Sequence, residues 1–171
     1  KSLEKANQFN NNDQEYLLLI NQVYDEITKI ITKFAEKAEK KGLTAIAKAC
    51  FNLSSVAPNT FMEACQLYWF ATIFRIGTAT IGRIDQHLYP FYRKDLTLKK
   101  TNQIFAKKVI SELLLRYEKR GKGKGDTLQN LTLSGKNHKG EDQTNDLTYL
   151  ILEQCIANKY LEPKVNVRIH Q

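Results

Sequence analysis

The residues best placed to do chemistry surround a glycine-bracketed turn near the middle of the chain. Gly77 and Gly82 enclose a short segment that carries the hydroxyls of Thr78 and Thr80. Glycine adopts backbone conformations that other residues resist, so such a turn can present short polar side chains. A threonine hydroxyl both donates and accepts hydrogen bonds, which would orient a hydroxyl or carboxylate of a ligand. We therefore predict that Thr78 and Thr80 line a cavity and bind substrate.

Arg83 and Asp85 follow the turn and are flanked by apolar residues. Because an unpaired buried charge is costly, this pattern indicates a buried polar network. We interpret Gly82, Arg83 and Asp85 as a structural motif in which the arginine pairs with the aspartate and holds the turn. On that interpretation, Gly82→Val or Asp85→Ala destabilises the fold by roughly 1–3 kcal/mol.

Two amides further along the chain are a second candidate site. Gln129 and Asn130 could present donors and acceptors to a substrate, or could only complete hydrogen bonds at the end of a strand. Arg75, before the turn, could pair with an acidic substrate or simply end a helix. The sequence leaves these alternatives open.

Three cysteines, Cys50, Cys65 and Cys155, are widely spaced and include no CxxC pair. This odd set argues against a zinc site and against a disulfide framework. We predict no metal site and no catalytic residue among them, and reduced thiols favour a cytoplasmic location.

The composition is that of an ordinary globular chain: 171 residues, 42% hydrophobic, 26% charged and a net charge of +8. No apolar run approaches the ~20 residues that span a bilayer. The first residues lack both Met and a signal-peptide core, so we expect an internally cut or processed chain. Lysines gather only at 118–125, where they alternate with glycine, so we expect no specific nucleic-acid binding.

Apolar residues at three- and four-residue steps predict that residues 1–118 are helical. The first helix ends at Gly42, the second covers 43–53, and Thr60 caps a third whose Trp69 and Phe70 belong to the core. A helix over 84–94 follows the turn. Thr97 is the expected cap of the next helix, whose apolar stripe consists of Phe105, Val109, Leu113 and Tyr117.

The remainder is predicted to be a flexible loop at 119–126 and a strand–helix–strand unit at 127–171. Residues 128–133 suit a strand, Thr144 caps a helix, and the alternating Val165, Val167 and Ile169 suit a second strand. The two strands should be parallel with a right-handed connection. His138 falls in a turn and is expected to be solvated; Arg168 and His170 are expected to be structural.

Residues 82–95, GRIDQHLYPFYRKD, resemble a motif of the glycyl radical enzymes, the group that contains pyruvate formate-lyase, glycerol and diol dehydratases and arylacetate decarboxylases. Four more segments resemble that family in the same order: 58–66, 128–135, 140–150 and 163–170. The resemblance implies an α/β chain, mostly helical, that is a fragment of a ten-stranded α/β barrel. The threonine turn departs from the His-Ser pair of the diol dehydratases.

The resemblance also implies the chemistry. In the family, a glycyl radical takes hydrogen from a loop cysteine, and the thiyl radical attacks the substrate. Neither loop is matched here, so we expect no cofactor on this chain and an organic glycyl radical in the full-length protein. Implied partners are a radical-SAM activating enzyme, a small-molecule substrate and a second copy of the chain in a homo-oligomer, with no specific nucleic acid and no membrane.

The sequence thus predicts part of a glycyl radical enzyme that cleaves a C–C, C–O or C–N bond, of the formate acetyltransferase, dehydratase or lyase type, and that is inactive as this fragment. The alternative is a non-catalytic helical remnant or binding module.

Overall fold

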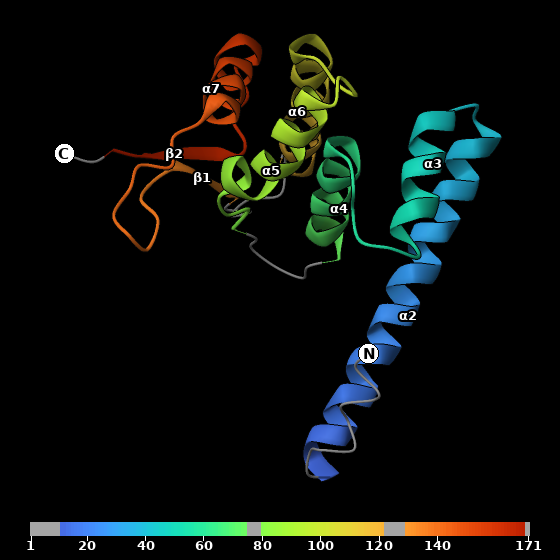
Figure 1. The fold of residues 1–171 in the computed structure, drawn as a ribbon. Coiled ribbons are helices and arrows are strands. Elements are labelled where there is room, and N and C mark those ends of the chain that lie inside the picture. Colours follow the sequence, from blue (N-terminus) through green and yellow to red (C-terminus); the bar gives the residue numbers. More distant parts are fainter. Residues whose placement is uncertain (1–10, 75–79, 122–128, 170–171) are drawn as a thin grey trace. The chain divides into compact units, whose positions relative to one another are not determined.

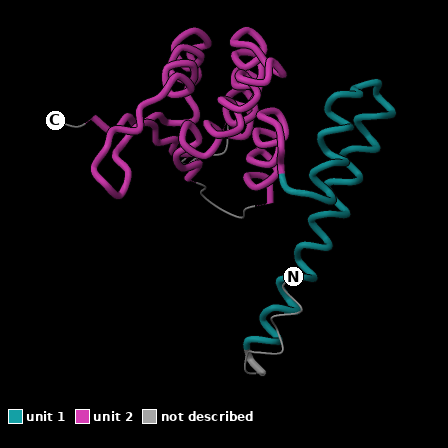
Figure 2. The backbone as a smooth tube through the Cα atoms, viewed as in Figure 1, with its two compact units in different colours: residues 1–57 teal, residues 58–171 magenta. Residues whose placement is uncertain are grey.

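The computed structural model describes residues 11–74, 80–121 and 129–169, and the chain forms two compact units, 1–57 and 58–171 (Figure 2). The predicted turn residues Arg75 and Thr78 lie outside the described residues, as does His170.

The first unit is a pair of antiparallel helices, α2 (Asn11–Lys40) and α3 (Thr44–Leu53) (Figure 1). Gly42 turns the chain with a φ of +71°, and the Leu43 N–H donates to the Ala38 carbonyl at 2.9 Å. Glycine adopts this left-handed conformation without strain, so the predicted end of the first helix is confirmed. The buried hydrophobic residues of this unit are Ile31 and five short ones: Ala35, Ala38, Ala47, Ala49 and Cys50.

Within its described residues, the second unit contains four helices and two strands (Figure 1). Its helices are α4 (Phe61–Ile73), α5 (Ile84–Thr97), α6 (Gln103–Gly121) and α7 (Asp146–Asn158). Its strands are β1 (Asn130–Ser134) and β2 (Lys164–Arg168). Among the described helices of the whole chain, none combines the length and the apolar character needed to cross a membrane.

The strands β1 and β2 pair in parallel, from Asn130 beside Lys164 to Ser134 beside Arg168. Helix α7 lies between them in the chain, so residues 130–168 form a strand–helix–strand unit. On the other side of β1, Gly82 forms a parallel bridge to Leu131. The segment before α5 therefore continues the sheet and ends at the residues predicted to do chemistry.

The helices cover one face of this sheet. Leu131 and Leu133 are fully buried in a core that also holds Ile84, Ile110 and Tyr117. Phe70 is buried as predicted, whereas Trp69 is half-buried and packs edge-on against Tyr117. This core fixes α5, α6 and α7 around the end of β1.

Two predicted helix caps are wrong. Thr97 is the last residue of α5, and the side chain of Asn102 instead accepts the Phe105 N–H at the start of α6. Helix α7 is capped by Asn145, not by Thr144, whose hydroxyl is bonded to Asp142. In both cases an asparagine side chain accepts backbone N–H groups in the first turn of the helix: that of Phe105 in α6, and those of Leu147 and Thr148 in α7.

The apolar stripe and the end of α6 also differ from the prediction. Phe105 is exposed, and the buried stripe of the helix consists of Ala106, Ile110, Leu113, Leu114 and Tyr117. Helix α6 extends through Gly121, so residues 119–121, expected to be loop, are helical. Pro90 lies inside α5 without ending it.

Candidate functional site

The carboxylate of Asp85 joins three elements at the start of α5. It is fully buried, and its Oδ2 accepts the Ser134 N–H at 2.7 Å, the Thr148 hydroxyl at 2.7 Å and the Gln86 amide at 2.9 Å. These donors come from the end of β1, from the first turn of α7 and from α5 itself. Hydrogen bonds to a buried carboxylate are among the stronger ones in proteins, so Asp85 fixes where β1 ends and α7 begins.

The neighbouring amides extend this network to the loop before α7. Gln86 Nε2 donates to the Gln143 carbonyl at 2.8 Å, and Asn145 Nδ2 donates to the Asp85 carbonyl at 3.3 Å. Asn145 also caps α7 through a capping box with Thr148. The start of α5 therefore holds residues 135–145 in place.

Arg83 has a different environment from Asp85. Among the residues that the structure describes, no ion pair joins the two, so the expected direct pairing is wrong. Neutral donors bond to Asp85 Oδ2 instead, and Asp85 Oδ1 has no partner in the described part of the chain. Arg83 Nη1 has one contact, 3.5 Å from the Lys136 carbonyl oxygen. Its Nε and Nη2 are buried and have no acceptor within the described part of the chain.

The face of the sheet away from the helices is polar. Side chains alternate between the two faces of a strand. Asn130 and Thr132 alternate with the buried Leu131 and Leu133 of β1, so they point to the face away from the helices. Their register partners on β2 are Lys164 and Asn166, both exposed. Arg168 is the next residue of β2 on this face.

The predicted site residues that can be placed fall into two groups. Thr80 is exposed beside the sheet, and Asn130 is half-buried on its open face. Gln129 is 2% exposed, and its Nε2 donates to the Tyr117 carbonyl at 2.9 Å, a contact that favours the strand-end alternative. Gly82 has a φ of +83°, a left-handed conformation that favours glycine. Substrate binding by any of them stays a prediction.

The sequence reasoning did not name Thr132, Lys164 or Asn166. The polar residues that alternate with Val165 and Val167 were a possible signal. Only the register of β1 with β2 places them beside Asn130. Arg168, expected to be structural, is exposed, and His138 is exposed as predicted.

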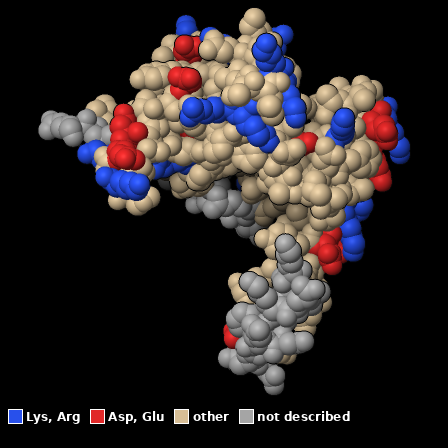
Figure 3. All heavy atoms as spheres, viewed as in Figure 1, with Lys and Arg blue, Asp and Glu red and all other residues tan. Residues whose placement is uncertain are grey.

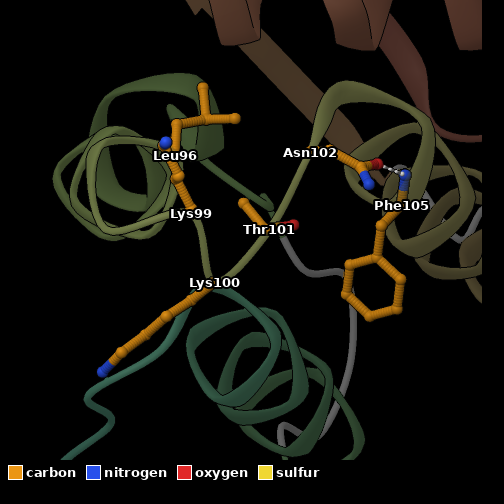
Figure 4. A pocket seen from close by; sticks show the side chains of 6 residues that line it. All are labelled: Leu96, Lys99, Lys100, Thr101, Asn102 and Phe105. Atoms are coloured by element: carbon orange, nitrogen blue, oxygen red, sulfur yellow. Dashed lines mark hydrogen bonds between the residues drawn. The ribbon is translucent and has the colours of Figure 1, made fainter.

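Two of the hollows on the described surface of the second unit lie elsewhere. One, of about 450 Å³, is at the α5–α6 turn and is lined by Leu96, Lys99, Lys100, Thr101, Asn102 and Phe105; Lys100 points away from Phe105 (Figure 4). The other, of about 400 Å³, lies beside Trp69. The guanidinium carbon of Arg116 lies over the Trp69 ring, 5.7 Å from the ring centroid. Neither is lined by a predicted site residue.

The charges and pKa values of the described residues indicate no further candidate site. On the face drawn in Figure 3, acidic side chains lie between the basic ones. Within the described residues, no group of three His, Cys, Asp or Glu side chains is arranged to hold a metal ion. Burial raises the pKa of the Cys65 thiol, and it raises the pKa of Cys155 to about 11, so neither is a thiolate at neutral pH.

Solved structures and curated sequences define the class of protein. The B12-independent glycerol dehydratase from Clostridium butyricum superposes with a TM-score of 0.75 at 26% identity, over 98% of this chain and 25% of that one. Hydroxyproline dehydratase from Clostridioides difficile gives 0.69 at 28% identity, over 85% and 21%. The (2S)-3-sulfopropanediol dehydratase of Klebsiella oxytoca is 32% identical over 84% of this chain and 20% of its own length. These are glycyl radical enzyme barrels, so the predicted fold class is confirmed.

The model of the pyruvate formate lyase-like family matches residues 3–171. The chain belongs to this family. It spans about a fifth of the length of the curated relatives that it matches.

Proposed function

We propose that the whole protein carrying this segment is a glycyl radical enzyme of the dehydratase or lyase type, which cleaves a C–O, C–C or C–N bond of a small molecule. Residues 80–82, β1 and β2 form the part of its barrel wall that contacts the substrate. Gln129 belongs to the same wall, and Thr78, Thr80 and Asn130 are the proposed substrate-binding residues.

One observation carries this proposal: the sheet is apolar where it meets the helices and polar on its other face. Leu131 and Leu133 are fully buried, while Asn130 and Thr132 alternate with them and lie level with Lys164 and Asn166. A wall that only packed against protein would need apolar side chains on both faces. Amides, a hydroxyl and an amine instead suit a wall that binds a polar ligand.

The relatives support a polar substrate. Curated relatives are named for (2S)-3-sulfopropanediol, trans-4-hydroxy-L-proline and isethionate. These small polar compounds need hydrogen-bonding groups around them, and the open face of β1 and β2 supplies such groups. An assay with these three compounds tests whether one of them is the substrate.

The rest of the machinery is proposed by analogy with the family. An organic glycyl radical would supply hydrogen-atom abstraction, a radical-SAM enzyme would install it, and the protein would act as a cytoplasmic homo-oligomer. This chain would bind and orient the substrate and exclude water from one side of it. The 171 residues by themselves are expected to be inactive.

The test uses the whole protein, activated anaerobically and assayed with the three compounds. We expect a carbon-centred radical doublet in electron paramagnetic resonance and turnover of a polar substrate. Thr132→Val and Asn166→Ala should leave the radical yield unchanged and lower kcat/KM at least about tenfold, because they remove contacts to substrate rather than to the radical. Asn158→Ala, an exposed amide on α7, is the matched control.

Two results would contradict the proposal. Absence of a radical in the parent protein would exclude the glycyl radical chemistry and leave the alternative of a non-catalytic helical remnant or binding module. The exposed Tyr16, Leu19 and Val23 of α2 would be the surface of such a module. Unchanged turnover in both wall variants would instead exclude the substrate-facing role of the sheet.

A further inference from the structure

Two of the three nitrogens of the Arg83 guanidinium have no acceptor in the described part of the chain. Its Nε and Nη2 are buried and bond to nothing in the described part of the chain. Nε and Nη2 are bonded to the same carbon, and one N–H bond of each lies in the guanidinium plane and points out along the same edge. That pair matches the two oxygens of a carboxylate, which arginine binds in a bidentate manner.

Acidic groups in this part of the fold bond to other residues, and among the described residues none forms an ion pair with Arg83. Asp85 accepts the hydrogen bonds from Ser134 and Thr148 through Oδ2, and its Oδ1 is buried without a partner in the described part of the chain. In the loop after β1, Glu141 Oε2 accepts the Asn137 amide at 2.7 Å, and Asp142 Oδ1 accepts the Thr144 hydroxyl at 2.8 Å. A buried charge without a counter-ion is costly, so the missing partner of Arg83 is an anion.

The position of the guanidinium is that of a ligand site. It lies over Gly135, immediately after β1: a methyl group on Gly135 would be 3.1 Å from Arg83 Nη2 and 3.2 Å from Arg168 Cδ. Gly135 has a φ of +108°, so glycine is required there and its missing side chain makes room for both arginines. Ligands of α/β proteins bind at this edge, where parallel strands end.

We propose that Arg83 binds the carboxylate of a small-molecule ligand side-on through Nε and Nη2. Arg168 completes the site. Its side chain is exposed and can move aside to admit the ligand, and its own guanidinium then supplies a second cation. The inference goes beyond the proposed function and stands without it, because its test measures binding and not turnover.

The test is a nuclear magnetic resonance titration of the 171-residue chain, reading the Nε–Hε signals of arginine and the amide signal of Gly135. Acetate is the probe, with chloride at equal ionic strength and neutral acetamide as comparators. We expect a saturable downfield shift of the Arg83 Hε with acetate only. Arg83→Lys keeps the charge and loses the planar fork, so it should weaken the acetate response of Gly135 at least about tenfold.

The matched control is Arg93→Lys, the same change at an exposed arginine of α5, which should leave the acetate response intact. Should Arg83→Lys fail to fold, the titration of the unmodified chain decides alone. The proposal is overturned if the Arg83 Hε does not respond to acetate, responds equally to chloride, or is already shifted downfield without a probe. The last result would mean that a group of the protein occupies the fork.

Discussion

The two compact units of this chain are stabilised in different ways. The helix pair of the first unit buries mostly short side chains, such as Ala35 and Ala47, and polar groups such as Thr32 and Ser54 bond to carbonyls of their own helix. The second unit buries large side chains, among them Phe61 and Tyr117. Its carboxylates also bond to distant segments.

Hydrogen bonds between residues far apart in the sequence are a feature of the second unit. Asp95 accepts the N–H of Phe61, 34 residues away, and Asp85 is bonded to residues 49 and 63 positions away. Buried apolar area is the main source of stability in both units, and alanines supply little of it per residue. The second unit should therefore be sensitive to polar substitutions, and the first to changes in side-chain volume.

The largest effect is expected for Asp85→Ala. The change leaves the Ser134 N–H and the Thr148 hydroxyl buried without an acceptor, which should lower the free energy of unfolding by about 3 kcal/mol. Urea unfolding followed by the fluorescence of Trp69, the only tryptophan, measures it in the second unit. Asp146→Ala, at an exposed position of α7, is the control; equal curves for the two variants would refute the role of Asp85.

Ala35→Leu tests the first unit. Ala35 is fully buried between α2 and α3, so a larger side chain must push the helices apart, at a cost of about 2 kcal/mol. Hydrogen exchange of the α3 amides should accelerate, whereas the Trp69 unfolding curve should not move. Glu36→Leu adds a comparable side chain at the next, exposed position and should have little effect; acceleration in both variants would contradict the packing argument.

Alkaline pH should weaken the second unit through Tyr117. Burial raises the pKa of Tyr117 to about 12, from 10.0 for an unperturbed tyrosine. The folded state thus holds this proton more tightly, so stability is complete below the lower pKa and falls as pH rises towards the higher one, by about 1.4 kcal/mol for each pH unit between them.

Tyr117→Phe should flatten this decline, measured as the free energy of unfolding across that pH range. Tyr24→Phe, an exposed tyrosine of α2, should not. A decline of the same slope in Tyr117→Phe would show that other groups cause it; burial also raises the pKa of Tyr68 to about 12.

The smallest effect is expected for Thr60→Ala at the start of α4. The Thr60 hydroxyl accepts the Glu63 N–H at 3.2 Å, and the Glu63 carboxylate accepts the Thr60 N–H at 3.0 Å. Losing half of this capping box should cost about 1 kcal/mol. Thermal melts give the measurement, with Thr97→Ala at the exposed end of α5 as comparator; superimposable melts would mean that the Thr60 hydroxyl does not stabilise the helix start.

The sequence by itself determined the family, the helices and the parallel pair of strands. These features follow from local pattern: the spacing of apolar residues sets the helix faces, Gly42 ends α2, and the run from Gly82 to Asp95 has a composition that few folds share. The capping threonine of α4 was predictable for the same reason, since Thr60 and Glu63 are close in sequence. Where two candidates were adjacent, as Thr144 and Asn145 are, local pattern could not choose between them.

Only the tertiary structure decided which polar groups meet. Arg83 and Asp85 are two residues apart, yet they face different surroundings, because Asp85 lies under α7 while Arg83 lies over Gly135 at the end of β1. The register of β1 with β2 placed Lys164 and Asn166 beside Asn130 and Thr132. Gln129 turned towards Tyr117 for a similar reason: a buried amide bonds to whatever acceptor the packed helices present. Such choices depend on contacts tens of residues apart, which spacing along the chain does not specify.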